Sequence, residues 1–318
     1  MKSFFLDGVK IGVTSSFVIT HQSVGETNEE FFKTKNKFIE KYGNILPLVV
    51  KPKMKVLIGC LFFFSRTGSE MYVFELAKNL MKMDCDVTVV SPNINGVLAV
   101  EARNIGIKVN TFESLPKDVV FDIIHTQHQP ITLELIRRFP TTKKIATIHS
   151  EVLDAEYPII HPSIVEYIAI RPNIVEMLVN KFKIPREKIS LIYNPIDNEK
   201  FHPLDVDGEN AILFVGTVDY LRRAALFDMV EHTKEREMNL WIIGKNHSDY
   251  LQQLLESSHV KYFEPTPDVE QYIHRCKETA GILLGRTTIE GWMCGKPGWI
   301  YEIDHGGNIL SKNFFDVP

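Results

Sequence analysis

The sequence is poor in cysteine and has no long hydrophobic run. Its 318 residues include four cysteines, widely spaced, with no Cys-x-x-Cys pair and no Cys/His cluster. This spacing argues against a zinc finger and indicates free thiols in a reducing compartment. The longest apolar run, 56–64, is far shorter than the roughly 20 residues of a membrane-spanning helix. We therefore expect a buried strand at this run and a cytoplasmic protein.

An excess of basic residues is also missing. The chain has 36 Lys and Arg against 40 Asp and Glu, which gives a net charge of -4. Nucleic-acid-binding domains normally carry a basic surface, so we expect no nucleic-acid partner. With 44% hydrophobic and 24% charged residues, the composition is that of an ordinary globular protein, long enough for about two domains.

Short apolar runs alternate with amphipathic stretches of helical length from residue 55 onward. Strands that are apolar on both faces and alternate with helices predict an α/β fold with doubly wound parallel sheets. The alternation stops at 196–210, which contains prolines, aspartates and a glycine, and then restarts. We therefore expect domains at 54–195 and 211–318, a linker at 196–210, and a ligand in the cleft at the strand carboxyl ends. Near that cleft we expect a helix at 268–278 and a strand at 280–284.

The first strand-to-helix turn contains Gly68 and Ser69. A helix N-terminus attracts anions through its free amide groups, and glycine lets the backbone approach a phosphate or a sugar. An ordinary tight turn with Ser69 as the helix N-cap explains the same residues. The turn lacks Gly-x-Gly-x-x-Gly, which argues against an NAD-dependent dehydrogenase.

Three histidines are candidate site residues in the first domain. His149 comes at the end of a predicted strand, where an imidazole can contact a sugar hydroxyl or a phosphate. A packed, hydrogen-bonded histidine is the other interpretation. His125 and His128 resemble a metal-binding pair, but no carboxylate lies beside them in the sequence, so we expect no metal.

In the second domain, Gly216 follows the first strand, and Arg222 and Arg223 lie just beyond it. A glycine followed by arginines suits a diphosphate, because a guanidinium group forms two parallel hydrogen bonds to it. A solvated helix start is the alternative interpretation.

The segment GRTTIEGWMCGKP, 285–297, places a carboxylate in an apolar stretch. Gly285 is expected to end a strand and Thr287 or Thr288 to cap the next helix, which puts Glu290 in the first helical turn. A carboxylate there can accept hydrogen bonds from the two vicinal hydroxyls of a ribose. Stabilisation of the helix dipole is the simpler alternative.

Taken in order, four segments resemble the GT-B glycosyltransferases of glycosyltransferase family 4: GSEMYVFELAKNL, FDIIHTQHQP, the stretch 174–203, and IEGWMCGKP. The resemblance covers roughly 54–318 and implies two Rossmann-like domains, with a nucleotide-sugar donor held mainly by the C-terminal one. It implies a hexosyltransferase-like enzyme that retains the anomeric configuration and needs no cofactor and no metal. The implied acceptor is a glycan or a lipid-linked molecule in surface polysaccharide or glycoconjugate assembly. Peripheral contact with the inner face of the membrane is left open.

Matched position by position, the resemblance implies roles for individual residues. Glu290 matches the ribose-binding glutamate and His149 the histidine near the transferred sugar, and these two form the catalytic set. Arg222 falls where the family has a diphosphate-binding lysine. The donor-binding set is completed by Gly68, Ser69, Gly216, Gly285, Arg286 and Thr287.

The sequence departs from the family pattern in three places. Ile282 replaces the first glutamate of a pair whose second member is Glu290, and Thr217 replaces an arginine. The chain ends at Pro318, whereas family members continue through further helices, so we expect an incomplete C-terminal domain. Arg286 is a candidate replacement for the missing positive charge. These departures favour an alternative function, a catalytically impaired nucleotide-sugar-binding or scaffold fragment of a larger glycosyltransferase.

Residues 1–53 stand apart from this unit. They resemble the tail of a family 2 (GT-A) glycosyltransferase, with His21 and Ser23 matching its His-x-x-Ser pattern. This resemblance implies a remnant of another glycosyltransferase domain. A plain N-terminal extension is the alternative.

Overall fold

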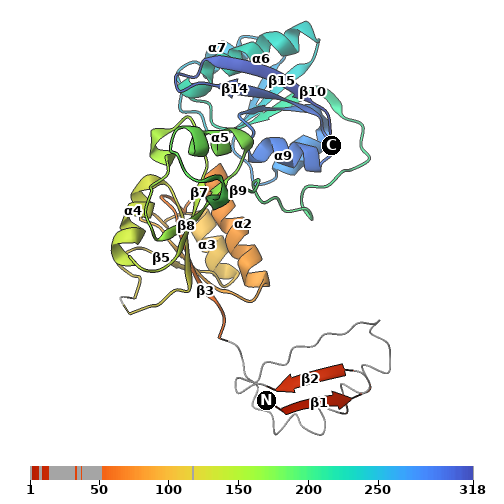
Figure 1. The fold of residues 1–318 in the computed structure, drawn as a ribbon. Coiled ribbons are helices and arrows are strands. Elements are labelled where there is room, and N and C mark those ends of the chain that lie inside the picture. Colours follow the sequence, from red (N-terminus) through yellow and green to blue (C-terminus); the bar gives the residue numbers. More distant parts are fainter. Residues whose placement is uncertain are drawn as a thin grey trace. The chain divides into compact units, whose positions relative to one another are not determined.

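The computed structural model describes residues 2–6, 9–13, 33, 37, 52–116 and 118–317. The chain divides into two units, Met1–Lys53 and Met54–Pro318. In the first unit, β1 (Lys2–Leu6) and β2 (Val9–Val13) form an antiparallel pair (Figure 1). His21 and Ser23 lie outside the described residues, so the proposed likeness of this unit to another glycosyltransferase stays a prediction.

The first part of the second unit is a seven-stranded parallel sheet with the order β5-β4-β3-β6-β7-β8-β9 (Figure 1). Its strands are β3 (Lys55–Gly59), β4 (Asp86–Val90), β5 (Lys108–Asn110), β6 (Ile123–Gln127), β7 (Lys144–Ile148), β8 (Ile164–Ala169) and β9 (Ile189–Leu191). The helices are α2 (Gly68–Lys82), α3 (Val97–Asn104), α4 (Gln129–Arg138) and α5 (Pro172–Asn180), with 3-10 turns η1 (Asp154–Glu156) and η2 (Arg186–Lys188). The strands are buried by these helices, which explains their nearly continuous apolar sequence.

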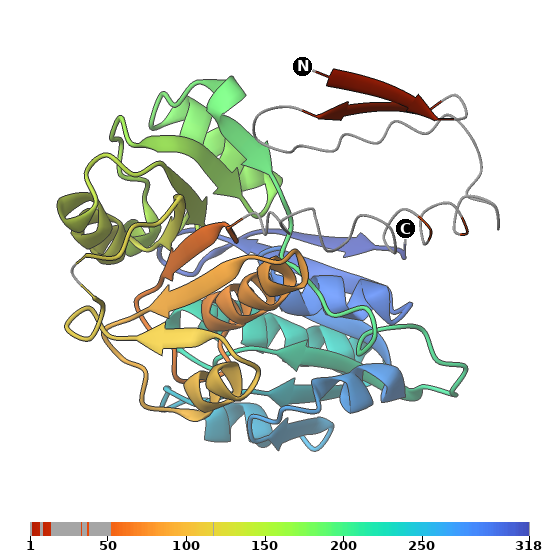
Figure 2. The ribbon, with the colours of Figure 1, turned by 90° about the horizontal axis from the view of Figure 1, so that it is seen from below.

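The second part is a six-stranded sheet with the order β12-β11-β10-β13-β14-β15, parallel except for β15 (Figure 2). Its strands are β10 (Glu209–Val215), β11 (Asn239–Ile243), β12 (Val260–Phe263), β13 (Cys276–Ile282), β14 (Gly298–Ile303) and β15 (Ile309–Phe315). Its helices are α6 (Arg223–Glu235), α7 (Leu251–Leu255), α8 (Val269–Arg275) and α9 (Arg286–Met293), with the 3-10 turn η3 (Tyr220–Arg222). The expectation of doubly wound α/β architecture is confirmed.

Both sheets reverse their strand order at one point. In the first sheet this point lies between β3 and β6, and in the second between β10 and β13. The chain leaves neighbouring strands in opposite directions there, so their carboxyl ends leave a crevice in which open α/β sheets bind ligands. The loops after these four strands are therefore the places to look for a site.

Some expected elements were wrong. The helix expected at 268–278 ends at Arg275, and Cys276–Ile282 is the central strand β13 instead. Cys276 and Thr279 are buried in that strand, so pairing with β10 and β14 overrides the helical pattern. Helix α4 and strand β15 were not anticipated, and β10 begins at Glu209, inside the expected linker. Among the described helices, none has the length and apolar character needed to cross a bilayer.

The loop after β10 depends on a glycine in the loop after β11. A Cβ atom on Gly244 would lie 1.9 Å from the carbonyl oxygen of Gly216, a backbone atom that cannot turn away. We predict that Gly244→Ala lowers the free energy of unfolding by about 1–3 kcal/mol. Gly68→Ala is the control, because a Cβ atom on Gly68 meets nothing within 4 Å, and its effect should stay within about 0.5 kcal/mol. Urea denaturation of both variants measures this, and equal effects would contradict it.

Candidate functional site

Gly216, Gly285 and Thr287 lie together where the strand order of the second sheet reverses. Gly216 follows β10 and donates its N–H to the carbonyl of Ile243 at 2.9 Å. The Thr287 hydroxyl donates to the carbonyl of Val215 at 3.3 Å, which joins the start of α9 to the end of β10. Three residues expected at a donor site are thus neighbours in space.

Helix α9 begins differently from the sequence-based expectation. Its N-cap is Gly285, and no side chain of the described residues caps it, so the expectation of a threonine cap is wrong. Glu290 is the fifth residue of the helix, beyond the first turn. The first amide groups of a helix have no partner within it, so they remain available at this end. The dipole explanation for Glu290 loses its basis, because the dipole acts mainly within the first turn.

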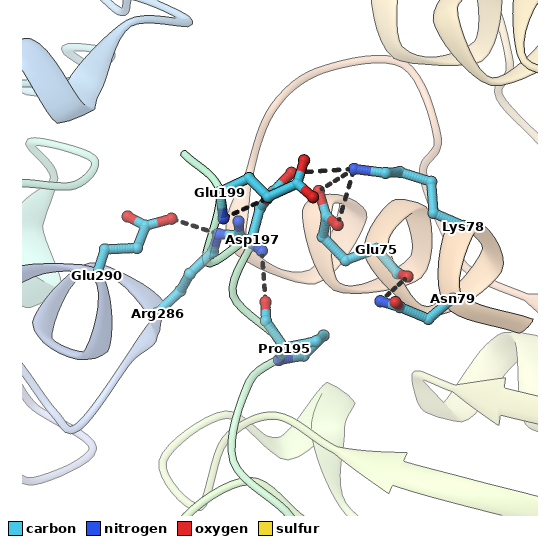
Figure 3. Close-up of polar contacts among 8 residues, drawn as sticks. All are labelled: Glu75, Lys78, Asn79, Pro195, Asp197, Glu199, Arg286 and Glu290. Atoms are coloured by element: carbon cyan, nitrogen blue, oxygen red, sulfur yellow. Dashed lines mark hydrogen bonds and ion pairs between the residues drawn. The ribbon is translucent and has the colours of Figure 1, made fainter. Parts of the chain in front are cut away.

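Glu290 forms a buried ion pair with Arg286, one helical turn before it. Arg286 Nε donates to Glu290 Oε1 at 2.6 Å, and the two side chains are 12% and 8% exposed (Figure 3). Burial raises the pKa of Glu290, and the Arg286 guanidinium opposes this rise. The carboxylate in this apolar stretch is therefore held by a positive charge from its own helix.

The linker segment 195–199 contacts both parts of the unit. Arg286 Nη1 donates to the carbonyl of Pro195 at 3.1 Å, and Asp197 accepts from Lys78 Nζ at 3.3 Å (Figure 3). Lys78 also bonds to Glu75 Oε2 of the same helix, α2, at 3.1 Å. The segment is thus tied to α9 at one end and to α2 at the other.

Arg222 is not a free cation. It ends the turn η3 and forms an ion pair with Asp219. The Asp219 carboxylate also accepts the Arg222 backbone N–H at 3.2 Å, which fixes the turn. Asp219 is the N-cap of η3, a position that aspartate commonly takes, and it was not among the residues expected from the sequence.

His149 directly follows β7, and His125 is the middle residue of the neighbouring strand β6. His149 Nε2 bonds to the side-chain oxygen of Gln127, and its ring packs edge-on against Tyr72 at 5.0 Å between centroids. His125 Nε2 lies 2.7 Å from the hydroxyl of Thr147. Burial lowers the pKa of both histidines, that of His125 to about 4, so both are neutral at physiological pH.

His128 has a carboxylate neighbour that the sequence did not reveal. Its Nε2 lies 3.3 Å from Oε1 of Glu156, a residue 28 positions further along the chain. His128 adopts φ 63°, an uncommon backbone conformation that concentrates at functional sites. Burial lowers the pKa of His128 to about 4 and raises that of Glu156 to about 7. The two groups thus lie close together near neutral pH without a full charge on either.

Two buried atoms of this cluster have no hydrogen-bond partner among the described residues, Gln127 Nε2 and Glu156 Oε2. Buried polar groups in native proteins are usually paired, so unpaired ones suggest a place for water or a ligand. No group of three or more His, Cys, Asp or Glu in the described part of the chain has a geometry that could hold a metal ion.

The loop before α2 is organised by Glu70. Its carboxylate accepts the backbone N–H groups of Phe64 at 3.2 Å and Ser65 at 2.5 Å. The helix N-cap is Thr67 rather than Ser69, and Gly68 is its first residue. The spacing Thr67-x-x-Glu70 is that of a capping box, but Glu70 bonds to the Phe64 and Ser65 amides instead and the Thr67 side chain forms no cap hydrogen bond.

The carboxyl-end loops of the two sheets contact each other. Arg171, at the start of α5, pairs with Glu151 and donates from Nη1 to the carbonyl of Leu284 at 3.4 Å. His305 Nδ1 lies 2.7 Å from the carbonyl of Val152. The loop that carries His149 therefore meets the loop that leads to Gly285.

Three solved structures show the same architecture at low sequence identity. A glycosyltransferase from Rickettsia africae ESF-5 is 16% identical, with a TM-score of 0.61 over 81% of each chain. HepE from Anabaena, in complex with UDP and glucose, is 14% identical, with a TM-score of 0.63 over 80% of this chain and 82% of that one. The pneumococcal O-GlcNAc transferase GtfA, in complex with UDP and GlcNAc, is 10% identical, with a TM-score of 0.57 over 80% and 84%.

These likenesses and the two doubly wound sheets place the chain in the GT-B fold class of glycosyltransferases. Residues 66–200 match the model of Glycosyltransferase Family 4, and no curated protein matches the chain. The family match over residues 66–200 and the shared fold agree with the resemblance seen in the sequence.

The buried carboxyl of Glu156 predicts a pH dependence of stability. The folded state holds its proton up to about pH 7, whereas the unfolded carboxyl loses it near its ordinary pKa of 4.5. The carboxyl of Glu156 therefore contributes its full stabilisation below pH 4.5, the pKa of the unfolded state. This contribution is lost as the pH rises to about 7, the pKa of the folded state. Between about pH 5 and about pH 8, the free energy of unfolding of the wild type should fall relative to Glu156→Gln, on the order of 1–3 kcal/mol.

Urea denaturation at the two pH values measures this difference. Glu134→Gln is the control, because burial is slight there and its arginine neighbours lower the pKa of Glu134 to about 2, below this window. Equal pH slopes for the wild type and Glu156→Gln would contradict the prediction.

Proposed function

We propose that the protein transfers a hexose from a nucleotide-sugar donor to a glycan or lipid-linked acceptor, with retention of the anomeric configuration, in surface polysaccharide or glycoconjugate assembly. The observation that carries the proposal is Glu290, a buried carboxylate in the helix that starts where the strand order reverses. UDP is present in the structures of HepE and GtfA, which supports a UDP-sugar as the donor.

In this proposal the second domain holds the nucleotide. Glu290 accepts hydrogen bonds from the ribose hydroxyls, and the free amide groups at the start of α9 face the diphosphate. Gly216, Gly285 and Thr287 shape the backbone around it, and Arg222 and Arg286 supply positive charge. The bond from the anomeric carbon to the diphosphate breaks during transfer, and these groups stabilise the charge on the leaving diphosphate. We expect no metal requirement.

The first domain then faces the sugar and the acceptor. His149 lies at the carboxyl end of β7 and, in this proposal, contacts the transferred sugar. Gly68 and Ser69 lie at the start of α2, where the backbone is open to a ligand. All four cysteines lie in the described part of the chain and are free, which supports a cytoplasmic location. If the acceptor is lipid-linked, the protein would contact the membrane surface where that acceptor lies.

One observation favours a second candidate function, a nucleotide-sugar-binding module without turnover. Ile282, at the end of β13, packs against the hydrophobic core of the second domain and offers no polar group. Thr217, in the loop after β10, likewise offers no charge to a phosphate. The two functions differ in turnover and agree on nucleotide binding.

The proposal predicts that the chain binds UDP and that Glu290 is needed for binding. Glu290→Gln should weaken UDP binding by about tenfold or more, because a hydrogen bond to a charged group is lost. Glu278→Gln is the matched control, since Glu278 is also paired with an arginine, Arg236, but lies away from α9. Isothermal titration calorimetry measures both variants.

Binding without sugar transfer across a panel of UDP-sugars and acceptors would support the second candidate. A wild-type chain that binds no nucleoside diphosphate would contradict both functions.

A further inference from the structure

Arg286 connects the candidate ribose ligand to the linker. Its guanidinium donates from Nε to Glu290 and from Nη1 to the carbonyl of Pro195 (Figure 3). The Arg286 side chain is only 12% exposed, which is unusual for an arginine. Burying a long charged side chain is costly unless its hydrogen bonds are made, so these contacts define where the side chain must lie.

The other charged and titratable groups around Glu290 cannot replace Arg286. The charge of Lys200, from the linker, also lowers the pKa of Glu290, but its Nζ is held 3.0 Å from Glu270 of α8 and 2.5 Å from the carbonyl of Pro267 rather than on Glu290. Glu270 carries the same charge as Glu290 and disfavours its ionised form, and Cys294, the C-cap of α9, is a buried thiol. Among the described residues, Arg286 is the one that both bonds to the Glu290 carboxylate and neutralises it.

The charge state of Glu290 decides what it can recognise. An ionised carboxylate is an acceptor only and can take a hydrogen bond from each of two vicinal hydroxyls. A protonated carboxyl has one oxygen occupied by its own proton, so it no longer matches a diol. A carboxyl as buried as Glu290 would take up a proton without a cation beside it.

We propose that Arg286 is a positioning residue that keeps Glu290 charged and oriented as the acceptor for the ribose diol of the donor. The bond to Pro195 fixes the guanidinium from the linker side, so the orientation of Glu290 depends on the linker as well as on α9. This inference rests on the proposed function, because it presumes that Glu290 binds a ribose.

The test is the pH profile of UDP binding by calorimetry, from about pH 6 to about pH 9, for the wild type, Arg286→Ala and Arg286→Lys. The wild type, measured at each pH, is the reference that removes the titration of the UDP phosphate, whose second pKa is about 6, from the comparison. Arg286→Ala should bind about tenfold more weakly near pH 7 and recover as the pH rises, because the unpaired Glu290 then loses its proton. Arg286→Lys keeps the charge and should restore the wild-type profile.

A second measurement needs no nucleotide. Carbon-13 NMR of labelled glutamate follows the titration of Glu290, whose signal is assigned by its loss in Glu290→Gln. The titration should move to higher pH in Arg286→Ala and return toward the wild-type value in Arg286→Lys.

The outcomes separate the two claims. A weakened Arg286→Ala whose binding does not depend on pH would mean that Arg286 acts only in packing, and the inference would fall. Wild-type strength in Arg286→Ala, or an unmoved Glu290 titration, would also overturn it. A shifted titration in a chain that binds no UDP would uphold the control of Glu290 charge by Arg286 and would refute the proposed function and the ribose role with it.

Discussion

The buried ion pair between Arg286 and Glu290 is the interaction on which the candidate nucleotide site depends. Two charges removed from water are tolerated only if they are paired and hydrogen-bonded, so the pair fixes both side chains at the start of α9. The same arginine bonds to Pro195, which extends this constraint into the linker. Because Asp197 of the linker is paired with Lys78, the constraint reaches α2 of the first domain.

The first domain also buries titratable side chains, but those around His128 do not form a charged pair. Its buried polar groups are neutral, because burial lowers the pKa of His125 and His128 and raises that of Glu156. Two atoms of this cluster remain without a partner among the described residues, and His128 has an uncommon backbone conformation. A cluster in which every buried polar atom had a hydrogen-bond partner would need no role beyond stabilising the fold. The unpaired atoms, at the carboxyl ends of β6 and β7, are the part of this domain most suited to meet a ligand.

Individual residues show which features the sequence predicted correctly and which it did not. The alternating apolar runs placed Gly216 directly after a strand, as observed, because buried parallel strands have a distinctive composition. Gly285 was expected to end a strand, but β13 ends at Ile282 and Gly285 is the N-cap of α9. Glu290 was expected in the first turn of its helix but lies beyond it, because α9 begins at Arg286 rather than after a threonine cap. The sequence suggested that the positive charge of Arg222 was free for a ligand, but the structure pairs it with Asp219. The roles of these residues in binding a donor stay predictions.

The alternation of apolar runs and amphipathic stretches along the chain was enough to predict the doubly wound architecture, because that architecture follows from local pattern. Only the tertiary structure decided which charges meet. Glu156 reaches His128 from a separate turn, and Arg171 reaches Leu284 from the other sheet. Such contacts join residues far apart in the chain, and their protonation depends on burial. Neither these contacts nor the protonation states follow from the local spacing of residues, because both arise only when the sheets and loops pack together.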